Sequence, residues 1–314
     1  MLRSLIFLVV LAGFAPAAWA DYPDRPIRLI VGYAPGGSTD IVARLMADRM
    51  GARLGQTMLV ENRGGAGGVA AAMIVLQQEA DGYTLMLETN GLNQAAALGT
   101  RMPFDPVEAW APIGLAAFGA NALVVHPSVP ARTMREFQAL GRAASEPLRF
   151  GSPSVGLTSQ LFAQGLGIEI EDIRYRGTSA ALADLLAGRF QAYTIALAGI
   201  LPHVQSGAIR ALAIAGTRRS AVMPDLPTTA EQGFPDLVVA SLFGLVSKAG
   251  TPAERITLLH ATLNAVLAEP ETTQRLFASG LEIDPSPDPA AFGRTIREDF
   301  ERWDTVARRG NLRQ

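Results

Sequence analysis

Short apolar runs rich in β-branched residues alternate along the chain with longer segments whose apolar residues recur three or four positions apart. The first such run covers residues 27–31, and helical spacing follows from Ile41 to Leu54. Further strands are predicted at residues 58–61, 84–88, 122–125, 148–150, 173–175, 190–195, 211–215 and 237–246, and closing helices at residues 252–268, 270–279 and 289–308. This alternation predicts an α/β protein with mostly parallel sheets covered by helices.

Four loops rich in glycine and serine lie where a predicted strand gives way to a predicted helix. They cover residues 33–40 and 62–68 in the first half of the chain, and residues 151–159 and 176–179 in the second. The first N–H groups of a helix have no partner inside it and carry about half a positive charge together, so such a loop favours an anion without Lys or Arg. The alternative, a tight turn that only caps its own helix, is less convincing for four such loops than for one.

The strand and helix pattern restarts after the proline-rich passage at residues 102–112. We therefore expect two crossings between domains, with residues 21–122 plus 243–314 in domain 1 and residues 123–242 in domain 2. In open parallel sheets, ligands bind outside the carboxyl ends of the strands, which is where the four loops and residues 89–91 should meet. The predicted ligand cleft thus lies between two Rossmann-like domains.

Length and composition agree with this interpretation, because 314 residues with 49% hydrophobic and 18% charged side chains suffice for two globular domains. The first twenty residues have the parts of a secretory signal peptide: Arg3, the apolar run 5–14, and small residues before a cleavage point after Ala20. A membrane anchor is the alternative, but the run is too short for about 30 Å of hydrocarbon. We expect residues 1–20 to be removed and the protein to be periplasmic.

Several classes of chemistry find no support in the sequence. There is no cysteine, and the three histidines are far apart, which argues against zinc, haem and cysteine catalysis; we expect no metal and no cofactor. A net charge of −2 without a basic run gives no support for nucleic acid as a partner. Neither a dinucleotide fingerprint nor a phosphate-binding Gly-Lys-Ser/Thr loop is present. An exported serine hydrolase is an open alternative, although no Gly-x-Ser-x-Gly elbow occurs.

Ordered motifs follow one another along the chain, at residues 22–27, 35–40, 60–68, 81–85, 104–106, 151–159, 175–177, 201–203, 224–228 and 249–252. In these motifs the chain resembles the periplasmic receptors of tripartite tricarboxylate transporters, the Bug-type family of extracytoplasmic solute-binding proteins. The resemblance covers essentially all of the chain after Ala20. It implies a non-enzymatic, two-lobed periplasmic-binding-protein fold of type II-like form, whose hinge closes on a small carboxylate.

The resemblance also implies which residues bind the ligand. One ligand carboxylate would be held by backbone N–H groups and ordered waters of the first two loops, and the distal end of the ligand would meet the second domain. The expected ligand-binding residues are Tyr33, Gly36, Gly37, Ser38, Thr39, Asp40, Arg63, Gly65, Ala66, Gly67, Gly68, Thr89, Asn90, Ser152, Gly156, Thr158, Ser159, Arg176, Gly177, Ala181, Thr194 and Ile195.

One departure from the family pattern bears on the ligand. Many relatives place Asp, often with Asn, where this chain has Ile195 and Ala196. An apolar side chain suits an apolar part of the ligand, so we expect a ligand without an α-amino group: a dicarboxylate, a tricarboxylate or an aromatic acid. The alternative is that Ile195 only packs in the core. The resemblance further implies delivery of the ligand to a membrane permease of one large and one small subunit; an orphan receptor used in sensing is the alternative. We expect the receptor to be a monomer.

Overall fold

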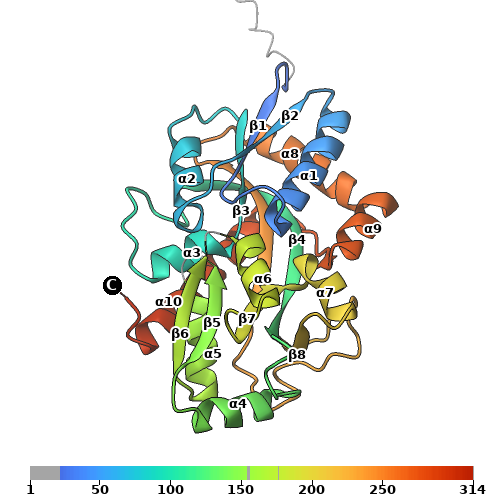
Figure 1. Cartoon of the computed structure of the whole chain (residues 1–314). Helices are drawn as coiled ribbons and strands as arrows, with labels where there is room; N and C mark the ends of the chain where they lie inside the picture. The colour runs from blue at the N-terminus through green and yellow to red at the C-terminus, as the bar shows by residue number, and fades with distance from the viewer. Residues whose placement is uncertain (1–21, 154–155, 176, 314) are drawn as a thin grey trace, which may run out of the picture.

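The computed structural model describes residues 22–153, 156–175 and 177–313, and its elements form two lobes (Figure 1). The expected signal peptide lies outside the described residues, so its cleavage stays a prediction. Within them, no helix has the length and apolar character needed to span a membrane. In chain order the elements are β1 (Ile27–Val31), α1 (Ser38–Leu54), β2 (Met58–Asn62), η1 (Ala66–Gly68), α2 (Val69–Leu76), β3 (Thr84–Glu88), α3 (Asn90–Ala97), β4 (Trp110–Val125), α4 (Met134–Ala143), β5 (Leu148–Pro153), α5 (Leu157–Leu166), β6 (Ile170–Tyr175), α6 (Thr178–Leu186), β7 (Ala192–Ala196), η2 (Leu197–Gly199), α7 (Leu201–Gln205), β8 (Arg210–Ile214), β9 (Ala240–Lys248), α8 (Ala253–Leu267), α9 (Pro270–Ala278), β10 (Leu281–Glu282) and α10 (Pro289–Arg309).

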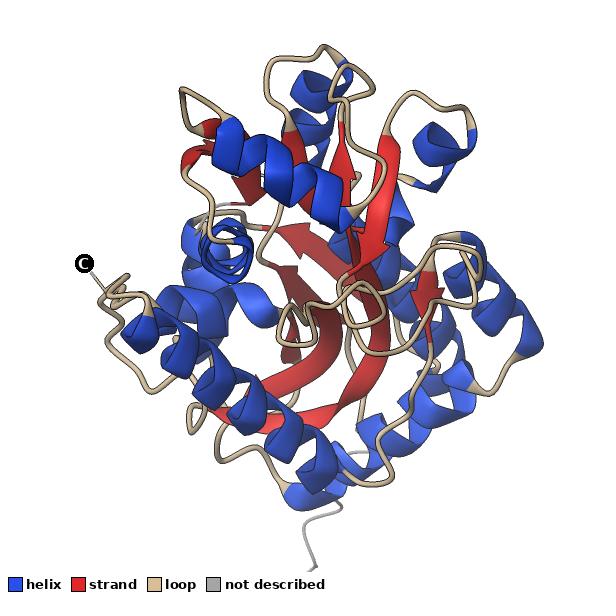
Figure 2. Ribbon diagram, turned by 90° about the horizontal axis from the view of Figure 1, so that it is seen from below, coloured by secondary structure: helices blue, strands red, loops and turns tan. Residues whose placement is uncertain are grey.

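The two lobes repeat one strand order around the long strand β4. In lobe 1 the order is β2-β1-β3-β9-β4, and in lobe 2 it is β6-β5-β7-β4-β8. The strands β1 to β3 are parallel to each other, as are β5 to β7, while the crossing strands β4 and β9 are antiparallel to their neighbours. Helices cover the sheets on both sides (Figure 2). The expected α/β architecture with mostly parallel neighbours is therefore confirmed.

Strand β4 links the lobes because it changes its partner part-way along its length. It pairs with β9 as far as Ala120 opposite Ala240, and with β7 from Asn121 opposite Ala196. The sequence pattern predicted only its last residues, 122–125, because Pro112, Gly114 and Gly119 interrupt the apolar run before them. The structure accommodates this interruption by shifts of register between Pro112 and Gly114 and between Leu115 and Ala117.

Helix α10 contributes to the cores of both lobes. Its first half places Phe292 and Ile296 in an apolar cluster with strands of lobe 1. Its second half places Trp303 and Ala307 in the main apolar cluster of lobe 2. The expected division into residues 21–122 plus 243–314 and residues 123–242 stays a prediction, but the end of α10 packs across it.

The sequence has the spacing of a capping box at residues 228–231 and again at residues 251–254, which predicts that Thr228 and Thr251 each cap a helix; the structure shows otherwise. The Thr228 hydroxyl accepts from the N–H of Glu231 at 3.0 Å and the Glu231 carboxylate accepts from the N–H of Thr228 at 2.7 Å, but turns follow instead of a helix. Helix α8 begins at Ala253 without a side-chain cap, because the Thr251 hydroxyl instead bonds the carbonyl of Lys248 at 2.7 Å. The reciprocal hydrogen bonds of a capping box therefore form between Thr228 and Glu231, although no helix follows them.

Candidate ligand-binding site

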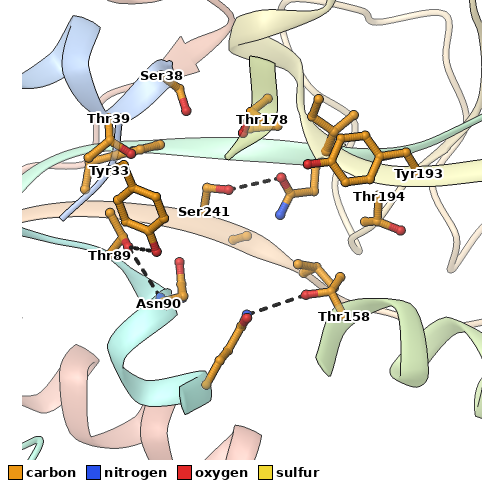
Figure 3. A pocket seen from close by; sticks show the side chains of 18 residues that line it. Tyr33, Ser38, Thr39, Thr89, Asn90, Thr158, Thr178, Tyr193, Thr194 and Ser241 are labelled. Atoms are coloured by element: carbon orange, nitrogen blue, oxygen red, sulfur yellow. Dashed lines mark hydrogen bonds between the residues drawn. The ribbon is translucent and has the colours of Figure 1, made fainter. Parts of the chain in front are cut away.

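A cavity of about 120 Å³ lies between the lobes, with residues of α1, α3 and the loops before these two helices on one side, and residues of α5, α6 and β7 on the other (Figure 3). The crossing strands β4 and β9 also contribute to its walls. Its lining residues are Tyr33, Ser38, Thr39, Thr89, Asn90, Gly91, Gln94, Asn121, Thr158, Thr178, Tyr193, Thr194, Ile195, Ala196, Val239, Ala240, Ser241 and Phe243.

The first wall contains the N-terminus of α1, where no side chain of the described residues caps the helix. Asp40 instead organises the loop before it, because its carboxylate accepts from the N–H of Gly36 at 3.0 Å and from Asn62 Nδ2 at 3.0 Å. Burial alone would raise the pKa of the Asp40 carboxyl, but hydrogen bonds from Arg44, Gly36 and Asn62 outweigh it and hold the pKa below its usual value. The ionised carboxylate thus fixes the loop and leaves the first helical N–H groups for an anion.

A second feature of this wall is a relay of hydrogen bonds to the Tyr33 phenol. The Thr89 hydroxyl accepts from the N–H of Gly91 at 3.3 Å and donates to the Tyr33 oxygen at 3.1 Å. Burial raises the pKa of Tyr33, so its phenol stays protonated at neutral pH. Because its oxygen already accepts a hydrogen bond, its own proton is available to an acceptor in the cavity.

The opposite wall brings together Thr178, Tyr193 and Thr194 (Figure 3). Helix α6 begins after Gly177, and here too no described side chain caps it. A second cavity of about 200 Å³ is lined from both sides by the starts of α1 and α6, and it shares Tyr33, Ser38, Thr39 and Thr178 with the first. Two uncapped helix N-termini therefore line one space, which favours an anion there.

Polar contacts at the base of the cavity connect the lobes and the crossing strands. Gln94 Nε2 on α3 donates to Thr158 Oγ1 on α5 at 3.5 Å, the upper limit for such a bond. On the crossing strands, Ser241 Oγ donates to Asn121 Oδ1 at 3.0 Å. Asn90 Oδ1 accepts from the N–H of Leu242 at 2.6 Å, which links the start of α3 to β9.

None of the 18 described residues that line the cavity is charged. Its polar atoms belong to hydroxyls, amides and phenols, which can all donate hydrogen bonds. Burial raises the pKa of Tyr193, so this phenol is a neutral donor as well. The site is thus suited to an anion that is held by neutral donors and helix N-termini, without a formal countercharge.

The structure brings about half of the predicted residues together. Lining the cavity are Tyr33, Ser38, Thr39, Thr89, Asn90, Thr158, Thr194 and Ile195; Gly37 and Gly177 line the adjoining cavity. Outside both linings are Gly36, Asp40, Arg63, Gly65, Ala66, Gly67, Gly68, Ser152, Gly156, Ser159 and Ala181. Arg176 lies outside the described residues.

The loop at residues 62–68 supports the first wall from behind. A Cβ on Gly67 would lie 2.6 Å from the carbonyl oxygen of Gly91, so only glycine allows α3 to pack this closely. The Arg63 side chain is 55% exposed and pairs with Glu61 at 3.1 Å. This loop therefore positions α3 and Asn62. The Arg63 guanidinium pairs with Glu61 of the preceding strand.

Sequence reasoning missed several lining residues of the sheets and of α3: Gln94, Asn121, Tyr193, Val239, Ala240, Ser241 and Phe243. Asn121 and Ser241 each stand as a single polar residue inside an apolar run, which is a faint signal. Their importance depends on the pairing of β4 with β9, which no local pattern reveals.

Comparison with known proteins decides the family. The family described as "Tripartite tricarboxylate transporter family receptor" matches residues 42–312. Protein BugT of Bordetella pertussis is 32% identical over 98% of this chain and 96% of its own length. The chain belongs to the tripartite tricarboxylate transporter receptors.

Two solved structures are similar to this receptor over nearly their whole length. The R. palustris protein Rpa4515 with adipate has a TM-score of 0.86 and 32% identity, covering 93% of this chain and 99% of its own. MatC from Rhodopseudomonas palustris with bound malate has a TM-score of 0.85 and 28% identity, covering 91% and 99%. The receptor thus has the α/β periplasmic-binding-protein fold, as expected, and belongs to a class of periplasmic solute-binding proteins without enzymatic activity.

Proposed function

We propose that this receptor captures a small organic acid without an α-amino group and delivers it to a tripartite tricarboxylate permease of one large and one small subunit. Adipate and malate, which the two similar structures contain, both lack an amino group. The ligand of this chain would be a dicarboxylate, a tricarboxylate or an aromatic acid. The observation that carries the proposal is the uncharged cavity at two uncapped helix N-termini.

One ligand carboxylate would lie at the start of α1, within reach of the N–H groups of Ser38 and Thr39. The Tyr33 phenol and the start of α6 would bind the same group from the other side when the lobes close. The apolar residues Ile195 and Phe243 then face the body of the ligand. An α-amino group would find no carboxylate among the described residues that line this cavity, so its desolvation would weaken binding.

A thermal-shift screen followed by calorimetry tests the proposal. Malate and aspartate form a matched pair, because they differ only in a hydroxyl against an amino group; adipate, benzoate and citrate extend the panel. A ligand bound only by the native state raises its stability by about 2.7 kcal/mol at a hundredfold excess over Kd. We expect at least one unaminated acid to bind in the micromolar range. Micromolar binding of aspartate or glutamate without any unaminated acid would contradict the proposal.

A further inference from the structure

Asn121 occupies the place where the two lobes share a strand. Strand β4 pairs with β9 up to Ala120 and with β7 from Asn121 onward. The Asn121 side chain lines the cavity, although the residue is only 6% exposed. It therefore lies at the junction of the two lobes and at the floor of the cavity.

Ser241 on the other crossing strand determines how the Asn121 amide is oriented. Its hydroxyl donates to Asn121 Oδ1 at 3.0 Å, so the amide oxygen is occupied and the amide nitrogen points elsewhere. No described residue accepts a hydrogen bond from Asn121 Nδ2. Nδ2 is not among the described polar atoms that are fully buried without a partner, so this amide donor is open to the cavity and can bind an acceptor there.

A second unused donor lies on the same face of the sheet. Asn121 is opposite Ala196 on β7, and Thr194 precedes Ala196 by two residues, so the side chains of Asn121 and Thr194 share one face. Thr194 is 6% exposed, and its hydroxyl has no hydrogen-bond partner among the described residues. Two neutral donors without acceptors thus occur together on the lobe 2 side of the cavity.

We infer that Asn121, oriented by Ser241, binds the second carboxylate of a dicarboxylate ligand together with the Thr194 hydroxyl. This inference rests on the proposed function, which places the first carboxylate at the start of α1. Hydrogen bonds to an ionised acceptor are about twice as strong as neutral ones, so an amide and a hydroxyl can hold a carboxylate without a cation. Asn121 is then the residue that distinguishes diacids from monoacids.

Calorimetry with matched acids tests the role of Asn121. Adipate and hexanoate have six carbons and differ in one carboxylate, and succinate and butanoate form the corresponding four-carbon pair. In the Asn121→Ala variant we expect the Kd of the bound diacid to rise about tenfold or more, and the Kd of the monoacid to change less than about twofold. A purely structural role would weaken both acids of a pair alike.

Two further variants separate the roles of Asn121 and Ser241. Asn121→Asp keeps the shape and the acceptor for Ser241 but replaces the amide donor by a negative group, so the diacid should lose more affinity than in Asn121→Ala. Ser241→Ala should weaken the diacid about threefold, and it should add nothing in combination with Asn121→Ala, because it acts through that residue.

The outcomes distinguish this inference from the proposed function. If the unmodified protein binds none of these acids nor any other unaminated acid of the panel, both are overturned. If it binds monoacids as tightly as diacids, or if Asn121→Ala and Asn121→Asp leave the preference for diacids unchanged, only the role of Asn121 is overturned. A preference for diacids that Asn121→Ala abolishes supports both.

Discussion

Asn90 Nδ2 donates a hydrogen bond of 2.8 Å to Asp299 Oδ1, although 209 positions separate the two residues in the chain. Asn90 lines the ligand cavity at the start of α3, and Asp299 lies in the middle of α10, between its contacts with the two lobes. The same carboxylate group also accepts from Asn93 Nδ2 at 2.9 Å and from Trp303 Nε1 at 3.1 Å. Helix α10 is thereby tied to the wall of the site.

Asp299→Ala is expected to destabilise the protein strongly. The residue is 3% exposed, and its removal leaves the buried donors of Asn90, Asn93 and Trp303 without their acceptor. We expect the free energy of unfolding in urea to fall by about 3 kcal/mol. Glu301→Ala, at an exposed acid on the same helix, is the control and should change it by about 0.5 kcal/mol or less. Equal effects of the two variants would contradict this role of Asp299.

Glu88 should make stability depend on pH. Burial and the nearby Asp299 carboxylate raise the pKa of Glu88 from its ordinary value of 4.5 to about 8. Between these pH values the folded state keeps a proton that the unfolded chain has released, so raising the pH favours unfolding. The contribution of this group to the free energy of unfolding should fall by about 1.4 kcal/mol per pH unit in this window.

Glu88→Gln removes this titration and keeps the shape of the side chain. Urea unfolding at pH 5.5 and pH 8 should therefore show a smaller loss of stability with rising pH in the variant than in the unmodified protein. The exposed Glu146→Gln serves as the control and should keep the original pH dependence. An unchanged pH dependence in Glu88→Gln would mean that Glu88 does not hold its proton in the folded state.

Gly37→Val and Arg63→Ala test whether backbone groups or a guanidinium hold the first carboxylate. A Cβ on Gly37 meets no protein atom within 4 Å, and its φ of −87° suits other residues, so the variant should fold. Gly37 lines the adjoining cavity between the starts of α1 and α6, so a valine side chain would take up space beside the proposed carboxylate position, and we expect the Kd for the ligand to rise about tenfold or more. Arg63→Ala removes an exposed side chain and should raise the Kd less than about threefold. The reverse order in calorimetry would make Arg63 the main anchor.

Ile195→Asp tests how the second lobe selects against amino groups. The residue lines the cavity and is 4% exposed, so a carboxylate there would repel an acid and pair with an ammonium group. We expect the ratio of aspartate to malate affinity to rise about tenfold or more. Ile195→Val keeps the apolar surface and should leave the ratio unchanged. Ile195→Asn, which adds a polar group without charge, is the second variant if Ile195→Asp does not fold. It should shift the affinity ratio in the same direction by a smaller amount. An unchanged ratio in both variants would show that Ile195 only packs in the core.

The first wall of the site was predictable because its chemistry is local. Glycines between a strand and a helix leave helical N–H groups without partners, and this is visible in residues 33–40 whatever the rest of the chain does. The structure places Ser38 and Thr39 of this loop in the lining. Asp40 of the same loop lies outside the lining, and its role in ligand binding stays a prediction; the sequence does not show that Gly36 and Asn62 donate hydrogen bonds to its carboxylate.

The floor of the site could not be predicted in the same way. Asn121 and Ser241 lie 120 positions apart, and they meet only because β4 pairs with β9. The sequence also predicted only the last part of β4, because Pro112 and the glycines of this strand are untypical of a strand interior. The structure accommodates them by shifts in the register of pairing with β9. Pairing over such distances depends on the assembled sheets, which a window of sequence does not contain.

By itself, the sequence determined the alternation of strands and helices, the glycine loops at the helix starts, and the membership in a family of periplasmic receptors. These follow from hydrophobic period, turn chemistry and ordered motifs, all of which are written along the chain. Only the tertiary structure decided that the loop at residues 62–68 supports the wall instead of lining it, that α10 reaches both lobes, and that Asn121 faces the cavity. The physical reason is that each of these depends on which distant surfaces pack together, so it exists only once both sheets and their shared strand have formed.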